Sequence, residues 1–306
     1  MSDSSALFQK TLKNKITFAG IGVHSGKPGR VTVYPSPVDT GLVLRSASCP
    51  DKPIKVGSFV PETALHATVV KADGWAISTI EHLMAALWMM RVDNAVVEFE
   101  GNEVPILDGS ALPFVQAIQD TGFDVSGQKR RFVMPKATLT LTDAKGRSIT
   151  ITPLPSVIET GVVSAAEADQ LTVDYTADFN HPLAGKPHLQ AAVTTDFFIK
   201  ELAPARTFGF LEQLPFLRQH NLAQGTSLGN TVVIGQEVLN DLRFADEPVR
   251  HKVLDLLGDV SLIGHRLIGS ITACKTSHSF NRMVVEHFVQ NPDQWMWVEG
   301  ELKDGE

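Results

Sequence analysis

Apolar and polar residues alternate in two short segments near the start of the chain, residues 15–18 and 30–34, on either side of a glycine-rich stretch. Alternation with a period of two is typical of half-buried strands, so we predict that these segments pair as neighbours. Residues 77–90 are mostly apolar and predict a buried helix, and residues 94–99 predict another strand. Ser110 is a suitable N-cap for a helix running to about Asp120.

A polar stretch with two glycines, residues 121–131, interrupts this pattern. It is the predicted boundary between two domains, 1–126 and 127–306. Beyond it, strands are predicted over residues 137–142, 148–152, 171–179 and 269–275, a short helix over 195–200, and a long helix from Pro248 to about Leu267. Each half then reads as a sheet with helices on one face, and the fold class is α+β.

Within the second half, residues 208–234 contain more apolar side chains than a small insert needs. The pattern predicts a strand, a helix and a second strand. These apolar residues either anchor the insert to its own domain or line a passage, and the two interpretations are compatible.

The long helix carries His251 and Asp255, four residues apart, so both side chains point to the same side. Most such pairs lie on solvated helix faces. Here, however, the pair borders a buried apolar stripe, and the pair Glu81–His82 likewise opens an apolar segment. Burying charged groups is costly unless they are paired or metal-bound. Two imidazoles and a carboxylate would form a three-ligand zinc site with a fourth position open for water, which Glu81 could deprotonate.

Seven segments resemble one family of enzymes. They are residues 20–26 (GIGVHSG), 78–87 (STIEHLMAAL), 103–110 (EVPILDGS), 178–182 (DFNHP), 205–210 (ARTFGF), 250–259 (RHKVLDLLGD) and 275–278 (KTSH). In their order they resemble the UDP-3-O-acyl-N-acetylglucosamine N-deacetylases, which catalyse the committed step of lipid A biosynthesis in Gram-negative bacteria. The resemblance implies two similar two-layer sheet-and-helix sandwiches with small inserts and the active site between them. It also implies a zinc-dependent hydrolase that removes the N-acetyl group from UDP-3-O-(3-hydroxyacyl)-N-acetylglucosamine.

By the same resemblance, Zn²⁺ is held by His82, His251 and Asp255, and Glu81 is the base. His278 would stabilise the oxyanion or protonate the leaving amine, Thr207 would help to hold the tetrahedral oxygen, and Asp259 would orient a ligand or the catalytic histidine. Substrate-binding candidates are Lys252 and Lys275 for the diphosphate, Phe179 for the uracil, and Phe208 and Phe210 in the insert, which forms an acyl passage in the family.

Two positions depart from the family pattern: Thr226 replaces a glycine in the insert and Ser277 replaces the glycine before His278. Neither removes a reacting group. His66 is a possible false ligand, and we leave it out of the metal site. Two other functions stay open: a zinc deacetylase for a different nucleotide sugar, and an inactive binder of acyl lipids or nucleotide sugars. The intact Glu81 argues against the binder, since binding alone would not need a base.

Composition narrows the expected partners. The net charge of −7 argues against nucleic acid, and the basic run 129–131 fits a linker better than a binding patch. Two cysteines cannot form a disulfide framework and suggest a reducing compartment. No segment reaches the roughly 20 apolar residues of a membrane span, and the start of the chain has no signal-peptide core. We expect a cytoplasmic monomer with at most peripheral membrane contact.

Overall fold

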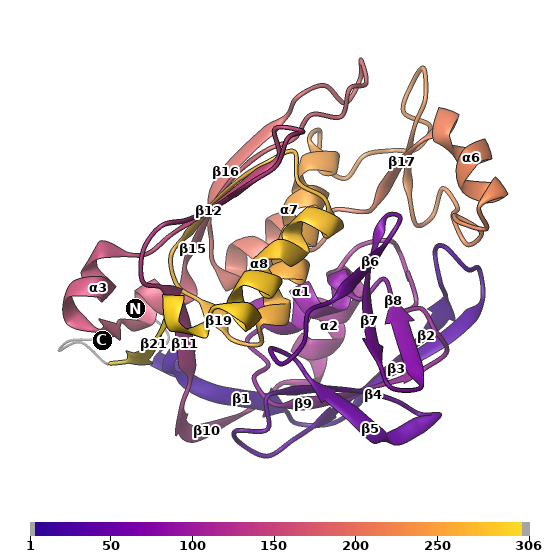
Figure 1. Cartoon of the computed structure of the whole chain (residues 1–306). Coiled ribbons are helices and arrows are strands. Elements are labelled where there is room, and N and C mark those ends of the chain that lie inside the picture. Colours follow the sequence, from indigo (N-terminus) through magenta and orange to yellow (C-terminus); the bar gives the residue numbers. More distant parts are fainter. Residues whose placement is uncertain (1–3, 302–306) are drawn as a thin grey trace.

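Two five-stranded sheets form the outer layers of the molecule, and the longer helices lie between them in the computed structural model, which describes residues 4–301 (Figure 1). The first sheet has the order β2-β3-β9-β4-β5: Ile16–Ile21, Pro28–Pro35, Ala95–Glu100, Leu42–Ser46 and Cys49–Lys55. The second has the order β12-β13-β20-β15-β16: Leu139–Thr142, Ser148–Thr152, Ser270–Cys274, Leu171–Thr176 and His188–Val193. The predicted α+β class is confirmed, as is the antiparallel pairing of β2 with β3.

Four helices form the middle of the molecule: α1 (Glu81–Met89), α2 (Leu112–Thr121), α7 (Glu247–Val260) and α8 (His278–Gln290). One continuous hydrophobic cluster joins them to both sheets. Helices α1 and α7 pack closely because Gly258 has no side chain. A Cβ there would lie 2.1 Å from the carbonyl oxygen of Glu81. This close contact brings the start of α1 against the middle of α7, where the candidate site residues lie.

Smaller sheets complete the fold. They are β1 (Phe8–Leu12) with β10 (Phe123–Lys129); β6 (Glu62–Ala64), β7 (Ala67–Ala72) and β8 (Trp75–Ser78); β14 (Val162–Val163), β21 (Trp295–Gly300), β11 (Arg131–Pro135) and β19 (Arg266–Leu267); and β17 (Phe208–Phe210) with β18 (Val232–Ile234). The short helices are α3 (Pro155–Thr160), α4 (Ala165–Asp169), α5 (Thr195–Phe197) and α6 (Leu214–Gln219), with helical turns at Ser4–Leu7, Phe198–Leu202, Leu211–Gln213, Ser261–Ile263 and Pro292–Gln294.

The prediction of one helix over 77–90 was wrong at its start. Ile77 and Ser78 end strand β8, and Thr79 has a positive φ of 58°, so the chain turns before α1 begins at Glu81. Ser110 is likewise not the N-cap of α2, which is Ala111. The Ser110 hydroxyl still accepts a hydrogen bond from the Leu112 amide at 3.1 Å.

The polar stretch 121–131 is not a linker. Most of it forms β10, which pairs with β1, so the boundary expected after residue 126 falls inside a strand. Its residues are polar because most of the strand faces solvent. Arg130, placed in the same supposed linker, is buried and forms a bidentate ion pair with Asp93 at 2.6 and 2.8 Å.

The long helix predicted to reach Leu267 ends at Val260, and the chain then turns at Gly264, whose φ is +80°. Leu267 lies in β19 instead. Similarly, the strand predicted over 171–179 ends at Thr176. The predicted strand–helix–strand insert is confirmed as β17, α6 and β18, and its two strands are parallel.

Within residues 4–301 the structure contains no helix long and apolar enough to cross a membrane. Both cysteines, Cys49 and Cys274, are free thiols.

Candidate active site

Two imidazoles and a carboxylate converge where α1 meets α7. The His82 Nε2 lies 3.6 Å from the Asp255 Oδ1, and the His251 Nε2 lies 3.3 Å from the same oxygen. All three side chains are buried. The His251 Nδ1 lies 3.0 Å from the carbonyl oxygen of Ala205, which accepts its proton and leaves Nε2 free to bind a metal. The structure therefore brings together the two histidines and the aspartate that the sequence grouped.

A second buried group adjoins the first. The His278 Nδ1 lies 2.9 Å from Asp259 Oδ2, and the other Asp259 oxygen accepts a hydrogen bond from the Thr68 hydroxyl at 2.5 Å. Glu81 accepts a hydrogen bond from the Thr68 amide at 3.2 Å. Glu81, Asp259 and His278 could also hold a cation by distance. However, the distance between His278 and Asp259 is that of a direct hydrogen bond. We therefore interpret this group as a hydrogen-bonded acid–base set.

Burial and neighbouring charges shift the pKa values of Glu81, His278 and Asp255. Burial raises the pKa of Glu81 to about 8, although His278 opposes the shift. Burial alone would lower the pKa of His278, but the carboxylates of Asp259, Asp255 and Glu81 together raise it to about 9. For Asp255, burial would raise the pKa, but the electrostatic interactions with His251, Lys252 and His278 hold it well below its usual value. A cationic histidine thus lies beside a carboxyl group poised near neutral pH.

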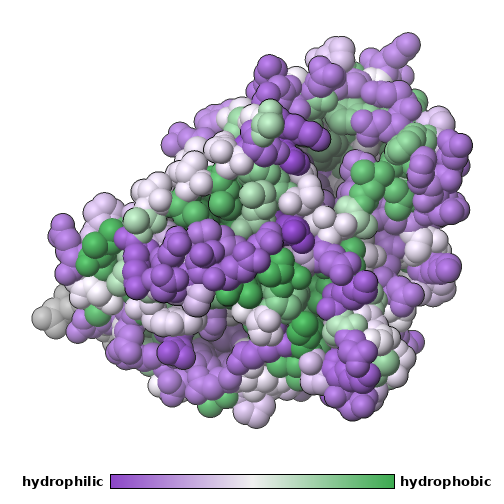
Figure 2. All heavy atoms as spheres, viewed as in Figure 1, coloured by the Kyte–Doolittle hydropathy of each residue, from purple (hydrophilic) through white to green (hydrophobic). Residues whose placement is uncertain are grey.

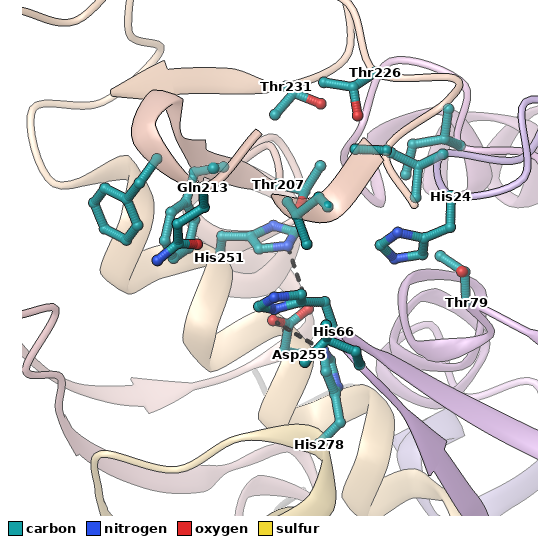
Figure 3. A pocket seen from close by; sticks show the side chains of 18 of the residues that line it. His24, His66, Thr79, Thr207, Gln213, Thr226, Thr231, His251, Asp255 and His278 are labelled. Carbon is teal, nitrogen blue, oxygen red and sulfur yellow. Dashed lines mark ion pairs between the residues drawn. The ribbon is translucent and has the colours of Figure 1, made fainter. Parts of the chain in front are cut away.

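The site opens into a cavity of about 390 Å³ whose walls come from both halves of the chain (Figure 3). Polar residues surround His82, His251 and Asp255, and apolar residues of the insert continue the wall. The apolar insert residues in that wall are Phe208, Phe210, Leu211, Leu214, Leu217, Ala223 and Val233, and Gly209, Gln213, Thr226 and Thr231 also line it. Figure 2 shows hydrophobic residues along a recess beside the insert. One cavity thus joins a polar reaction centre to an apolar channel wall.

Of the other predicted site residues, some line the cavity and some do not. Thr207 lines the cavity, as do Phe208, Phe210 and Lys252, whose ammonium group contacts Asp255 at 2.8 Å. Phe179 and Lys275 do not line the cavity. Phe179 packs behind the wall, 5.1 Å from the Phe208 ring, and Lys275 forms an ion pair with Asp178 at 2.9 Å. The structure therefore brings Lys252, but not Lys275, to the reaction centre.

Sequence reasoning gave no role to three polar residues of the cavity wall, His24, His66 and Thr79. The Glu103 carboxylate organises two of them: it accepts the His24 amide at 2.8 Å and the Thr79 hydroxyl at 3.1 Å. Gly22 makes this possible, because a Cβ there would lie 2.0 Å from that carboxylate. The glycine-rich segment 20–26 and Glu103 were both visible as motifs, but nothing in the sequence linked them.

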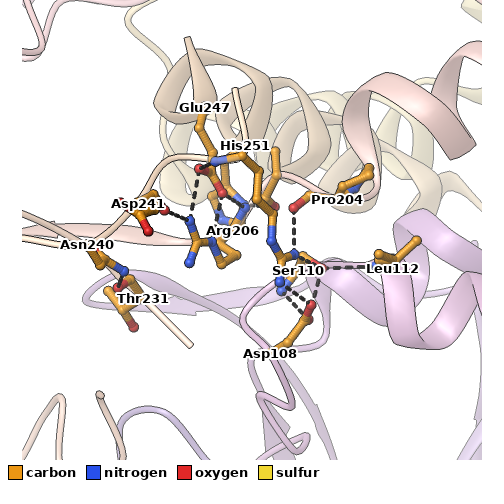
Figure 4. Close-up of polar contacts among 12 residues, drawn as sticks. Asp108, Ser110, Leu112, Pro204, Arg206, Thr231, Asn240, Asp241, Glu247 and His251 are labelled. Atoms are coloured by element: carbon orange, nitrogen blue, oxygen red, sulfur yellow. Dashed lines mark hydrogen bonds and ion pairs between the residues drawn. The ribbon is translucent and has the colours of Figure 1, made fainter. Parts of the chain in front are cut away.

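A buried ion pair fixes the loop before the insert (Figure 4). The Glu247 carboxylate has no solvent exposure and accepts the backbone amide and the Nε of Arg206, each at 2.9 Å. Arg206 lies between Ala205, whose carbonyl oxygen contacts His251, and Thr207. The ion pair therefore holds both neighbours in position relative to α7.

Two imidazoles and a carboxylate in contact, with a separate carboxyl group and a cationic histidine at a cavity, define the site class of a metal-dependent hydrolase. Comparison with known proteins gives the particular family. Residues 9–290 match the profile of UDP-3-O-acyl N-acetylglycosamine deacetylase, and the chain belongs to this family, a family of metalloenzymes. The expected family resemblance is thereby confirmed.

Curated relatives agree. A UDP-3-O-acyl-N-acetylglucosamine deacetylase from Syntrophotalea carbinolica is 40% identical over 302 residues, which cover 96% of this chain and 91% of the relative. The protein of that name from Citrifermentans bemidjiense is 41% identical over 298 residues, covering 96% and 92%. The one from Cellvibrio japonicus is 38% identical over 303 residues, covering 95% and 93%.

Proposed function

We propose that this chain hydrolyses the acetamide of UDP-3-O-(3-hydroxyacyl)-N-acetylglucosamine, releasing acetate and the free amine, as the committed step of lipid A biosynthesis. The observation that carries the proposal is the shared cavity. It is lined by three residues that could hold a metal ion, a carboxyl group, a cationic histidine and an apolar wall that suits an acylated substrate. Family membership supports the same reaction.

We assign His82, His251 and Asp255 as ligands of Zn²⁺. Ligand atoms about 2.0–2.2 Å from a tetrahedral zinc lie about 3.3–3.6 Å apart, and the two nitrogen–oxygen distances here are 3.3 and 3.6 Å. Two neutral imidazoles and one carboxylate are also a donor set that zinc prefers. Bound Zn²⁺ supplies positive charge that acidifies water and polarises a carbonyl oxygen.

Glu81 is the proposed general base, because its carboxylate reaches the same cavity as its neighbour His82 without belonging to the ligand cluster. It takes a proton from the water that attacks the amide carbon. Thr207, in the cavity wall, donates a hydrogen bond to the oxygen that becomes negative in the tetrahedral state.

His278 is the proposed acid. Its Nδ1 proton is held by Asp259, so its Nε2 proton is the one available to the cavity. When the C–N bond breaks, this proton passes to the leaving nitrogen. Asp259 acts as a positioning residue that keeps the imidazole charged and oriented.

For the substrate, the insert residues Phe208 and Phe210 suit contact with the acyl chain, since both line the apolar wall. Lys252 lies at the reaction centre and suits an anionic group of the substrate. Lys275 and Phe179 do not line the cavity. Contact of Lys275 with the diphosphate, and of Phe179 with the uracil, would therefore require the chain around Asp178 to rearrange. We further propose that the two sheet-and-helix halves act as two domains of a cytoplasmic monomer that meets the acyl substrate without a membrane-spanning segment and binds no nucleic acid.

The direct test measures acetate release from the UDP-linked acyl sugar by the purified protein, before chelation, after chelation and after Zn²⁺ is added back. We expect activity, its loss and its recovery. No acetate release by the zinc-loaded protein would refute the proposed reaction. Release from the nucleotide sugar lacking the acyl chain, with equal kcat/KM, would favour a deacetylase for a different nucleotide sugar.

A further inference from the structure

A second cavity, of about 370 Å³, lies beyond the opposite ends of the two catalytic helices. It is lined by Trp88, near the end of α1, and by Ser261, just after α7, with β19 beside it (Figure 1). The active-site residues lie at the start of α1 and in the middle of α7. This second cavity is therefore separate from the one that the proposed reaction uses.

The second cavity is strongly cationic, although the chain as a whole is anionic. Its charged lining residues are Lys55, Arg91, Arg130, Arg131 and Arg266, against Asp39 and Asp93. Arg91 is paired with Asp169, and Arg130 with Asp93. His265, also in the lining, has its pKa lowered to about 4 by burial and by the charges of Arg131 and Lys55, so it adds no charge at neutral pH.

Arg266 is the unusual member of this set. Its side chain is only 5% exposed, and among the described residues no carboxylate pairs with it. Its Nε and Nη2 have no hydrogen-bond partner, while Nη1 contacts only the sulfur of Met89. The guanidinium also lies 4.8 Å from the centre of the Trp88 ring. Burying a cation with unsatisfied donors is costly, so a bound anion would supply the missing partner.

We propose that this cavity binds a phosphorylated small molecule, with its phosphate held by Arg266 and its organic part against Leu42 and Val92. A guanidinium fork matches two oxygens of a phosphate. The cavity is larger than a phosphate alone requires, and both apolar side chains are buried in its lining. The exposed Lys55 and Arg131 lie at its mouth, where their charges attract an anion.

The test compares the zinc-loaded protein with Arg266→Met, which keeps the apolar stem and removes the charge. Inorganic phosphate and glycerol 3-phosphate are titrated at constant ionic strength by calorimetry, and Tm is followed in parallel. We expect both to bind the wild type and raise its Tm, with glycerol 3-phosphate binding more tightly, and Arg266→Met to bind about 10-fold more weakly or worse. Arg30→Met removes an exposed arginine outside the cavity and should behave as wild type.

Folding should not obscure the result, because removing an unpaired buried charge is expected to leave Tm unchanged or higher. As a second variant, Lys55→Ser with Arg131→Ser alters only exposed side chains and should weaken binding several-fold. Equal binding by wild type and Arg266→Met would place the anion elsewhere, for instance at the zinc ligands, and would overturn the proposal. No binding by the wild type at millimolar concentrations would do the same.

Discussion

At the scale of single residues, two adjacent side chains of the site have different proposed roles. Glu81 and His82 are neighbours on α1, yet they join different clusters: His82 contacts Asp255, and Glu81 lies with Asp259 and His278. In the proposed mechanism, this separation allows a base and a metal ligand to act side by side. The sequence could predict it, because adjacent residues on a helix point in different directions.

Glu81→Gln should therefore keep the metal and the fold but lose the base, lowering kcat by about 10²–10⁴-fold. The measurement combines steady-state kinetics with zinc analysis. Gln is isosteric and can still accept the hydrogen bond from Thr68, so the fold has no reason to change. Turnover near the wild-type value at saturating substrate would remove Glu81 from the mechanism.

His82→Ala and Asp255→Ala should instead lose zinc and activity together, because each removes one of three ligands. Elemental analysis of the purified variants checks this, and circular dichroism controls for folding. Full zinc occupancy in both variants would contradict the ligand assignment.

The raised pKa values of two acid–base groups, Glu81 and His278, predict the pH profile. Activity should rise as Glu81, with its pKa raised to about 8, loses a proton, and fall as His278, with its pKa raised to about 9, loses its own. The kcat/KM profile should be bell-shaped, and in His278→Gln the basic limb should disappear. A basic limb unchanged in that variant would assign it to another group.

At the scale of elements, sequence periodicity found most strands of the two large sheets and the insert, but it misplaced several ends. Helix α7 passes at Val260 into a tighter helical turn, Ser261–Ile263, which ends where Gly264 takes a left-handed conformation. Helix α1 starts late because Thr79 takes a positive φ. Helix α8 was missed, although His278 opens it. The segment 121–131 looked like a linker because β10 is largely exposed. Such features depend on tertiary pairing, which a local pattern does not contain.

The clustering of the proposed metal ligands His82, His251 and Asp255 could be predicted from spacing and motif, whereas the pairing of Glu103 with His24 and Thr79 could not. These contacts join a loop at residues 22–26 to one near residue 103. A motif reveals which residue types are present, but only the folded chain shows that they meet.

The packing of α1 on α7 gives a prediction at this scale. Gly258→Ala should force the helices apart, because the new Cβ would lie 2.1 Å from the Glu81 carbonyl oxygen. Overpacking of this kind costs about 1–3 kcal/mol, and we expect lower kcat as well. Urea denaturation measures the loss of stability. Gly127→Ala, where a Cβ meets nothing within 4 Å, is the matched control. Equal stability and kcat for Gly258→Ala would show that the helix contact adapts freely.

The insert predicts a dependence on acyl length. If the chain lies along the wall formed by Leu214 and Leu217, each CH₂ removed from the substrate should cost about 0.8 kcal/mol in transition-state binding. Leu217→Trp narrows this wall and should penalise long chains more than short ones, with zinc content unchanged. Equal kcat/KM for long and truncated substrates would leave the insert with a packing role alone.

At the scale of the whole molecule, one hydrophobic cluster runs through both halves, and the active site lies where they meet. Thr68 and Asp259, which share a hydrogen bond in the site, are 191 residues apart in sequence. Contacts of such separation form late in folding, because a long loop must close before they are gained. During synthesis, α1 leaves the ribosome long before α7 exists. The proposed catalytic set therefore stays incomplete until the second half of the chain has been made and packed on the first, so hydrolytic activity would report that the two halves have folded together.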